Sequence, residues 1–154
     1  MIEPAAALAK SRDWDYEIIS PLQLALATTS PRHRIINSGA IYCSIDGGAW
    51  GIVLMQFFEP LSTRIEDVGT AVLRLKEFCA PAELDLKYEV FIRYALDLEI
   101  DEDVENQLGR AIDEGLAHLD MAWAVLQLVN FAEKSADDAI AEVSASVFHE
   151  QEPT

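Results

Sequence analysis

At 154 residues and 51% hydrophobic side chains, the chain is long enough for one domain with its own core, and it needs neither disulfides nor metals to fold. The formal net charge is -16, and 21 of the 27 acidic side chains lie in residues 61–154. Such a surface excludes nucleic-acid binding, which requires Lys and Arg at phosphates, and favours basic partners. Acidic helix faces that are only solvated explain the charge as well.

The cysteines and the N-terminus predict a cytoplasmic protein. Cys43 and Cys79 lie far apart in apolar stretches, so we expect buried free thiols in a reducing compartment. The first residues lack the basic and apolar regions of a secretory signal. No apolar run approaches the ~18 residues of a membrane span, so we expect no membrane contact.

The first third of the chain predicts a helix and strands. Pro4 and the alanines after it favour a helix over about residues 4–12. An acidic and aromatic alternation at 13–18 leads into the sheet, and an apolar alternation at 22–28 predicts a strand. Residues 30–34 predict a turn or loop. The basic cluster Arg32-His33-Arg34 within it either grips an acidic group or belongs to a plain loop.

A second strand and a hairpin turn follow. Residues 35–45 predict the strand, in which Gly39 is a candidate bulge. Asp46-Gly47-Gly48 is a hairpin-type turn signal.

Residues 50–58 predict a strand that is apolar on both faces. The apolar side chains divide by parity into Trp50, Ile52 and Leu54 on one face and Val53, Met55 and Phe57 on the other. Such a strand is covered on both faces within the fold, or one of its faces is free to bind a partner. We therefore take Trp50, Ile52 and Met55 as a candidate contact patch.

The next segment predicts a helix over about residues 64–79. Apolar residues recur there at helical spacing, and Pro81 closes the helix. Ser62 or Thr63 is the expected N-cap, and Glu66 completes a capping box with Thr63.

In residues 84–100 every second side chain is apolar, and most of the others are charged. This period predicts a strand with one face in a core and the other in water. Its 17 residues would span roughly 55 Å, against a radius of gyration of roughly 15 Å for such a domain. The run is therefore a hairpin or a sharply bent strand, with Lys87-Tyr88 as the expected bend. Phe91 is an apolar residue among the alternate positions that are mostly charged. Together with Arg93 and Ala95 it forms the main candidate contact patch.

The C-terminal third predicts a long amphipathic helix. Asp101 or Asp103 is the expected cap, the helix ends near residues 134–135, and the interior glycines Gly109 and Gly115 indicate close packing on the sheet. Residues 137–148 predict a short amphipathic helix, and we expect 150–154 to be disordered.

We therefore expect an α+β fold with an antiparallel sheet of about four to five strands and helices mainly on one face. The long amphipathic helix is the C-terminal element of a single domain over residues 1–134. A short amphipathic helix or a flexible acidic tail follows at 135–154.

No residue set in the sequence carries recognisable chemistry. Asp101-x-Asp103-x-Glu105 begins like a calcium loop but lacks the required later Gly and Glu. Glu114 and His118 lie one helical turn apart without a second histidine nearby, which favours a surface contact over a metal site. No serine has a nucleophile-elbow setting. We expect no catalytic residue, metal or cofactor, and no enzymatic activity.

Several segments resemble one known family. Residues 82–86 (AELDL) and 90–99 (VFIRYALDLE) resemble the core of YbjN-like domains, in which a long helix with an LD…W/Y rhythm follows, here at 119–123 (LDMAW). Residues 13–16 (DWDY) are similar to the family's entry segment. The resemblance covers about residues 5–131, and the family's Asp-Gly turn between its last two strands is absent here.

The resemblance implies a fold similar to type III secretion chaperones, which are small, acidic, usually dimeric and bind client segments without chemistry. We interpret the chain as a chaperone-like protein or assembly adaptor that holds a client segment through a sheet edge or an apolar groove. The sequence leaves open whether the protein forms a homodimer. The alternative is an acidic inhibitor, immunity-type or stress-regulatory protein that binds a basic partner through residues 101–120.

Overall fold

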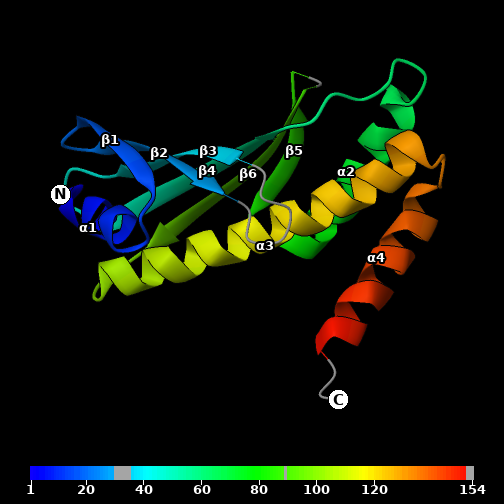
Figure 1. Cartoon of the computed structure of the whole chain (residues 1–154). Helices are drawn as coiled ribbons and strands as arrows, with labels where there is room; N and C mark the ends of the chain where they lie inside the picture. The colour runs from blue at the N-terminus through cyan, green and yellow to red at the C-terminus, as the bar shows by residue number, and fades with distance from the viewer. Residues whose placement is uncertain (30–35, 89, 152–154) are drawn as a thin grey trace.

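The computed structural model describes residues 1–29, 36–88 and 90–151, which form four helices and six strands (Figure 1). In chain order these are α1 (Glu3–Ser11), β1 (Asp15–Ser20), β2 (Gln23–Thr29), β3 (Ile36–Cys43), β4 (Ala49–Phe57), α2 (Ile65–Cys79), β5 (Glu83–Lys87), β6 (Phe91–Glu99), α3 (Val104–Phe131) and α4 (Ala136–Gln151). The α+β class is confirmed. The sheet has six strands instead of the expected four to five, because the entry segment joins it as β1.

The described strands form one antiparallel sheet in the order β1-β2-β3-β4-β6-β5. The prediction of a bulge at Gly39 is wrong, because Gly39 pairs with Leu26 and Leu54 in an unbroken register. A Cβ atom at Gly39 would lie 3.0 Å from Leu54 Cδ2 and 3.2 Å from Leu26 Cδ1. The glycine therefore makes room for two core leucines.

The helices lie on one side of the sheet (Figure 1). α3 contacts β4 and β6, α2 contacts β5, and α1 contacts β1 and β2. Side chains alternate across a strand, so only one parity faces these helices. On β4 this parity is Trp50, Ile52, Leu54 and Gln56, all of which are buried. The opposite face of the sheet has no helix over it among the described residues.

The expected bend at Lys87-Tyr88 is confirmed, and residues 84–100 are a hairpin. β5 pairs antiparallel with β6. Tyr88 adopts a φ of 53°, and the Val90 N–H donates a hydrogen bond to the Lys87 carbonyl over 3.2 Å. The chain thus reverses through a tyrosine in the left-handed region, which usually favours Gly or Asn.

The predicted capping box of α2 is wrong. Arg64 is the N-cap residue, and no described side chain forms a cap hydrogen bond there. Its guanidinium instead donates to the carbonyl oxygens of Val129, over 2.9 Å, and Lys134, over 3.3 Å. Val129 lies in the last turn of α3, which has no basic residue of its own, and Lys134 follows the helix three residues after its end. Arg64 therefore supplies the positive charge that this helix end favours.

The N-terminal end of α3 is only partly as expected. Asp103 occupies the N-cap position, with a φ of 53°. Its carboxylate accepts a hydrogen bond from the Asn106 side chain over 3.1 Å, and no described side chain caps the backbone.

α4 packs on the helical layer and matches the predicted short helix. Ala139 and Val143 are buried, and α4 contacts α2 and α3. Ion pairs join Arg74 to Asp137 over 3.5 Å and Lys134 to Glu142 over 2.6 Å. The helix extends through residues 150 and 151, where disorder was expected, whereas residues 152–154 lie outside the described part. The predicted loop at 30–34, with its basic cluster, also lies outside it.

The expected close packing of α3 on the sheet is confirmed at Gly115. A Cβ atom there would lie 2.7 Å from Tyr94 Cε1 and 2.9 Å from Leu54 Cδ1. Gly109 instead approaches α1, where a Cβ atom would lie 3.3 Å from Leu8 Cδ1. The two glycines therefore serve different contacts of the same helix.

We expect Gly115→Ala to lower the free energy of unfolding by about 1–3 kcal/mol, because overpacking outweighs the better helix propensity of alanine. Gly69→Ala in α2 is the matched control. Nothing lies within 4 Å of the added methyl group, so this variant should gain about 0.5–1 kcal/mol. Urea denaturation of both variants measures the difference, and stabilisation by both would contradict close packing at Gly115.

Candidate partner-binding surface

The face of the sheet opposite the helices carries a groove of about 780 Å³, which we call the open-face groove. It runs over β3, β4, β6 and β5, and its lining includes Tyr42, Gly51, Val53, Glu83, Ala95 and Asp97. These side chains share the parity that points away from the helices.

Small residues explain why the sheet surface is hollow there. Ala40 pairs with Val53, Val53 with Ala95, and Ala95 with Glu83, so one row across four strands carries mainly short side chains. In the next row Gly51 lies between Tyr42 and Asp97. A Cβ atom at Gly51 would lie 3.3 Å from Asp97 Oδ1, so the carboxylate leans over the glycine.

The structure brings four of the predicted site residues together on this face. Phe91, Arg93 and Ala95 of β6 share it with Met55 of β4, which pairs directly with Arg93. Arg93 and Ala95 line the groove. An ion pair of 3.5 Å joins Arg93 Nη1 to Asp85 Oδ2 on β5, so a carboxylate already partners this guanidinium.

Two residues that sequence reasoning missed complete an apolar patch beside the groove. Phe57 pairs with Phe91, and their rings meet edge to face with centroids 5.9 Å apart. Phe57 is 59% exposed. Val53 lies opposite Ala95 in the groove itself. Both residues point to the same face of the sheet as Met55, and this alternation along the strand is the signal that could have identified them.

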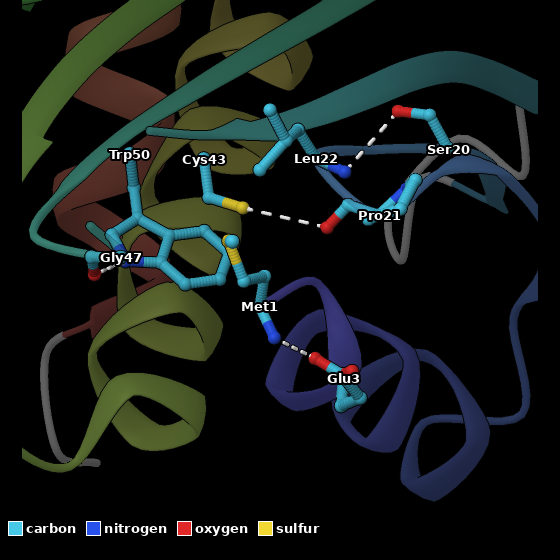
Figure 2. A network of polar contacts seen from close by, with 8 residues as sticks. All are labelled: Met1, Glu3, Ser20, Pro21, Leu22, Cys43, Gly47 and Trp50. Atoms are coloured by element: carbon cyan, nitrogen blue, oxygen red, sulfur yellow. Dashed lines mark hydrogen bonds and ion pairs between the residues drawn. The ribbon is translucent and has the colours of Figure 1, made fainter. Parts of the chain in front are cut away.

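The prediction that Trp50 and Ile52 belong to a contact patch with Met55 is wrong. Trp50 is 3% and Ile52 is 1% exposed, and both belong to the hydrophobic core. The Trp50 indole N–H donates a hydrogen bond to the Gly47 carbonyl over 2.8 Å, which fixes the ring beside the β3–β4 turn (Figure 2). Met55 has the opposite parity, so the three side chains cannot share one surface.

The two cysteines are free and buried, as expected. Cys43 Sγ lies 3.9 Å from the Pro21 carbonyl oxygen (Figure 2), and Cys79 Sγ lies 3.5 Å from the Leu75 carbonyl oxygen. Burial raises the pKa of the Cys43 thiol, and it raises the pKa of Cys79 to about 11. A protonated thiol is a poor nucleophile and metal ligand, so neither cysteine is a candidate site residue.

His118 lies on the helical side of the sheet, where its ring stacks on Tyr94 with centroids 5.8 Å apart. It is therefore an aromatic contact of α3 with β6. Among the described residues, no group of three or more His, Cys, Asp or Glu side chains is placed to hold a metal ion.

Comparisons with known proteins bear on the fold. No family model and no curated protein matches the chain. The fold is similar to the crystal structure of YbjN from E. coli, a proposed transcription regulator, with a TM-score of 0.51 and 10% identity. The match covers 79% of this chain and 87% of that one. The predicted resemblance to YbjN-like domains is thus confirmed for the fold.

Within the part of the chain that the structure describes, no helix is both long enough and apolar enough to span a membrane.

We expect the free energy of unfolding to fall between about pH 9 and pH 11, because Cys79 then loses its proton more easily in the unfolded chain. Below pH 9 the thiol is protonated in both states and its contribution is constant. The loss should reach about 2–3 kcal/mol, as expected for a shift of roughly two pKa units. Denaturation of the wild type and of Cys79→Ala across this range isolates the effect, and parallel profiles would disprove it.

Proposed function

We propose that this protein is a non-enzymatic, cytoplasmic binding protein, a chaperone-like factor or assembly adaptor, that holds a segment of a client protein on the open face of its sheet. One observation carries the proposal. The sheet has apolar side chains on both faces, but the helices cover only one of them. An apolar sheet face is normally buried against a second layer.

The patch beside the open-face groove has the character of an interaction surface. Phe57 and Phe91 form an aromatic pair that is largely open to solvent on its Phe57 side, and Met55 lies next to it on β4. Contiguous exposed apolar surface of this kind marks binding sites on soluble proteins. The groove supplies the concavity that holds a client side chain or segment.

Regulation of transcription, which is proposed for YbjN, fits this chain only through a protein partner. A net charge of -16 opposes contact with DNA phosphates. A regulatory role would therefore act by holding another protein.

A second candidate function is inhibition of a basic target by residues 101–120. Asp101, Glu102 and Asp103 are exposed together at the start of α3, which favours this reading. Farther along α3 the acidic surface is weaker, because Arg12 binds Asp113 through two hydrogen bonds of 2.7 Å and 3.0 Å. Such binding would depend strongly on salt, since exposed charges are screened over ~8 Å at physiological ionic strength.

Phe91→Glu tests the main proposal. Phe91 is only partly buried on the open face, so we expect the variant to fold and to lose at least about tenfold of its captured client, because a charge then sits in the apolar patch. Affinity purification from lysate of the source organism with quantitative mass spectrometry measures the capture, and circular dichroism monitors folding.

Leu73→Glu is the matched control. Leu73 is 68% exposed on α2, on the helical side of the protein, so the same chemical change there should leave capture unaltered. Unchanged partners on a folded Phe91→Glu protein would exclude this patch as the client site.

A further inference from the structure

Most of the charged side chains that line the open-face groove are acidic. Glu83 of β5 and Asp97 and Glu99 of β6 line it, and all three are exposed. Among the described residues that line the groove, Arg93 is the single basic one, and it is already paired with Asp85. An apolar floor with an acidic rim is complementary to a segment that is apolar in its middle and basic at its sides.

The backbone of the floor limits the conformation of the occupant. β4 lies between β3 and β6, and β6 lies between β4 and β5. The backbone groups of β4 and β6 therefore serve the sheet ladders, and an extended segment over these two strands would find no free ladder to join. Among the strands under the groove, only β5 has an outer edge that no described strand pairs with. A helix satisfies its own backbone hydrogen bonds and docks through side chains alone.

The dimensions suit one helix. Four adjacent strands extend over roughly 14 Å from the first axis to the last. A helix with its side chains is about 10–12 Å wide.

The chain itself does not supply the occupant. Two copies that met through this face would bring the carboxylates of Glu83, Asp97 and Glu99 of both copies into one interface. α4 carries Asp137, Asp138 and Glu142 and is already packed on α2 and α3. Like charges at close range oppose both arrangements.

Building on the function proposed above, we propose that the open-face groove binds an amphipathic helix of another protein, with an apolar stripe against Val53 and Ala95 and Lys or Arg residues beside Glu83, Asp97 and Glu99. The apolar contact holds the helix in the groove, and the acidic side chains around it favour basic helices over acidic ones.

The test uses three labelled synthetic peptides of ~18 residues. The first has Leu at helical spacing and Lys elsewhere, the second has the same Leu positions with Glu elsewhere, and the third has the composition of the first with Leu alternating at period two. We expect only the first to bind, with an affinity that falls as salt is raised. Equal binding of the third peptide, or any preference for the second, would overturn the inference.

Variants of the protein locate the site. We expect Asp97→Lys/Glu99→Lys to weaken binding of the first peptide by at least about tenfold. Glu77→Lys/Glu133→Lys changes the net charge by the same amount at exposed positions on α2 and after α3 and should change the affinity less than about threefold. Equal weakening by both pairs would show attraction to net charge alone and would refute the groove.

The two proposals fail separately. If Phe91→Glu abolishes client capture while the Leu and Lys helix does not bind, the client site stands and its preference for a basic helix is refuted. If the peptide binds with the expected discrimination, amide chemical shift changes should cluster on β4 and β6, and changes confined to the helical layer would refute the site.

Discussion

The contact of α3 with the sheet at Gly115 decides which side of the central strands is buried. Without a side chain at this position, the helix comes close to Leu54 on β4 and Tyr94 on β6. Since strand side chains alternate, the neighbours of these two residues, Val53 and Ala95 among them, must point the other way. The open-face groove is thus a consequence of the one-sided packing of α3.

The helical layer is held together independently of that open face. Hydrogen bonds from Arg64 to the carbonyls of Val129 and Lys134 join the loop before α2 to the end of α3 and to the segment after it. Asn130 Oδ1 also accepts a hydrogen bond from the Leu61 N–H over 2.8 Å. The Trp50 indole secures the β3–β4 turn from the core side. The contacts of Arg64 and Asn130 involve none of the residues that line the groove, so side chains of the lining can vary in size and charge without breaking them.

Features set by local pattern could be predicted from the sequence, and features set by distant contacts could not. Length alone required residues 84–100 to turn, and parity alone placed Phe91 and Ala95 on one face. Both parities of residues 50–58 are apolar, so only the position of α3 shows that Trp50 is core and Met55 is not. The cap of α2 was missed for the same reason, since Arg64 bonds to residues more than sixty positions away.

The acidic residues of the chain fall into two groups that differ in their position in the structure. Glu77 and Glu133 are exposed on the helical side, where solvation is sufficient explanation. Asp97 and Glu99 line the open-face groove, whereas Asp103 lies in a smaller pocket with Leu8 and Arg12. Apolar client binding and acidic recognition of a basic partner are competing interpretations of the sequence, and the open-face groove offers apolar and acidic side chains for both. A single basic amphipathic helix would satisfy both, so the two functions need not be alternatives.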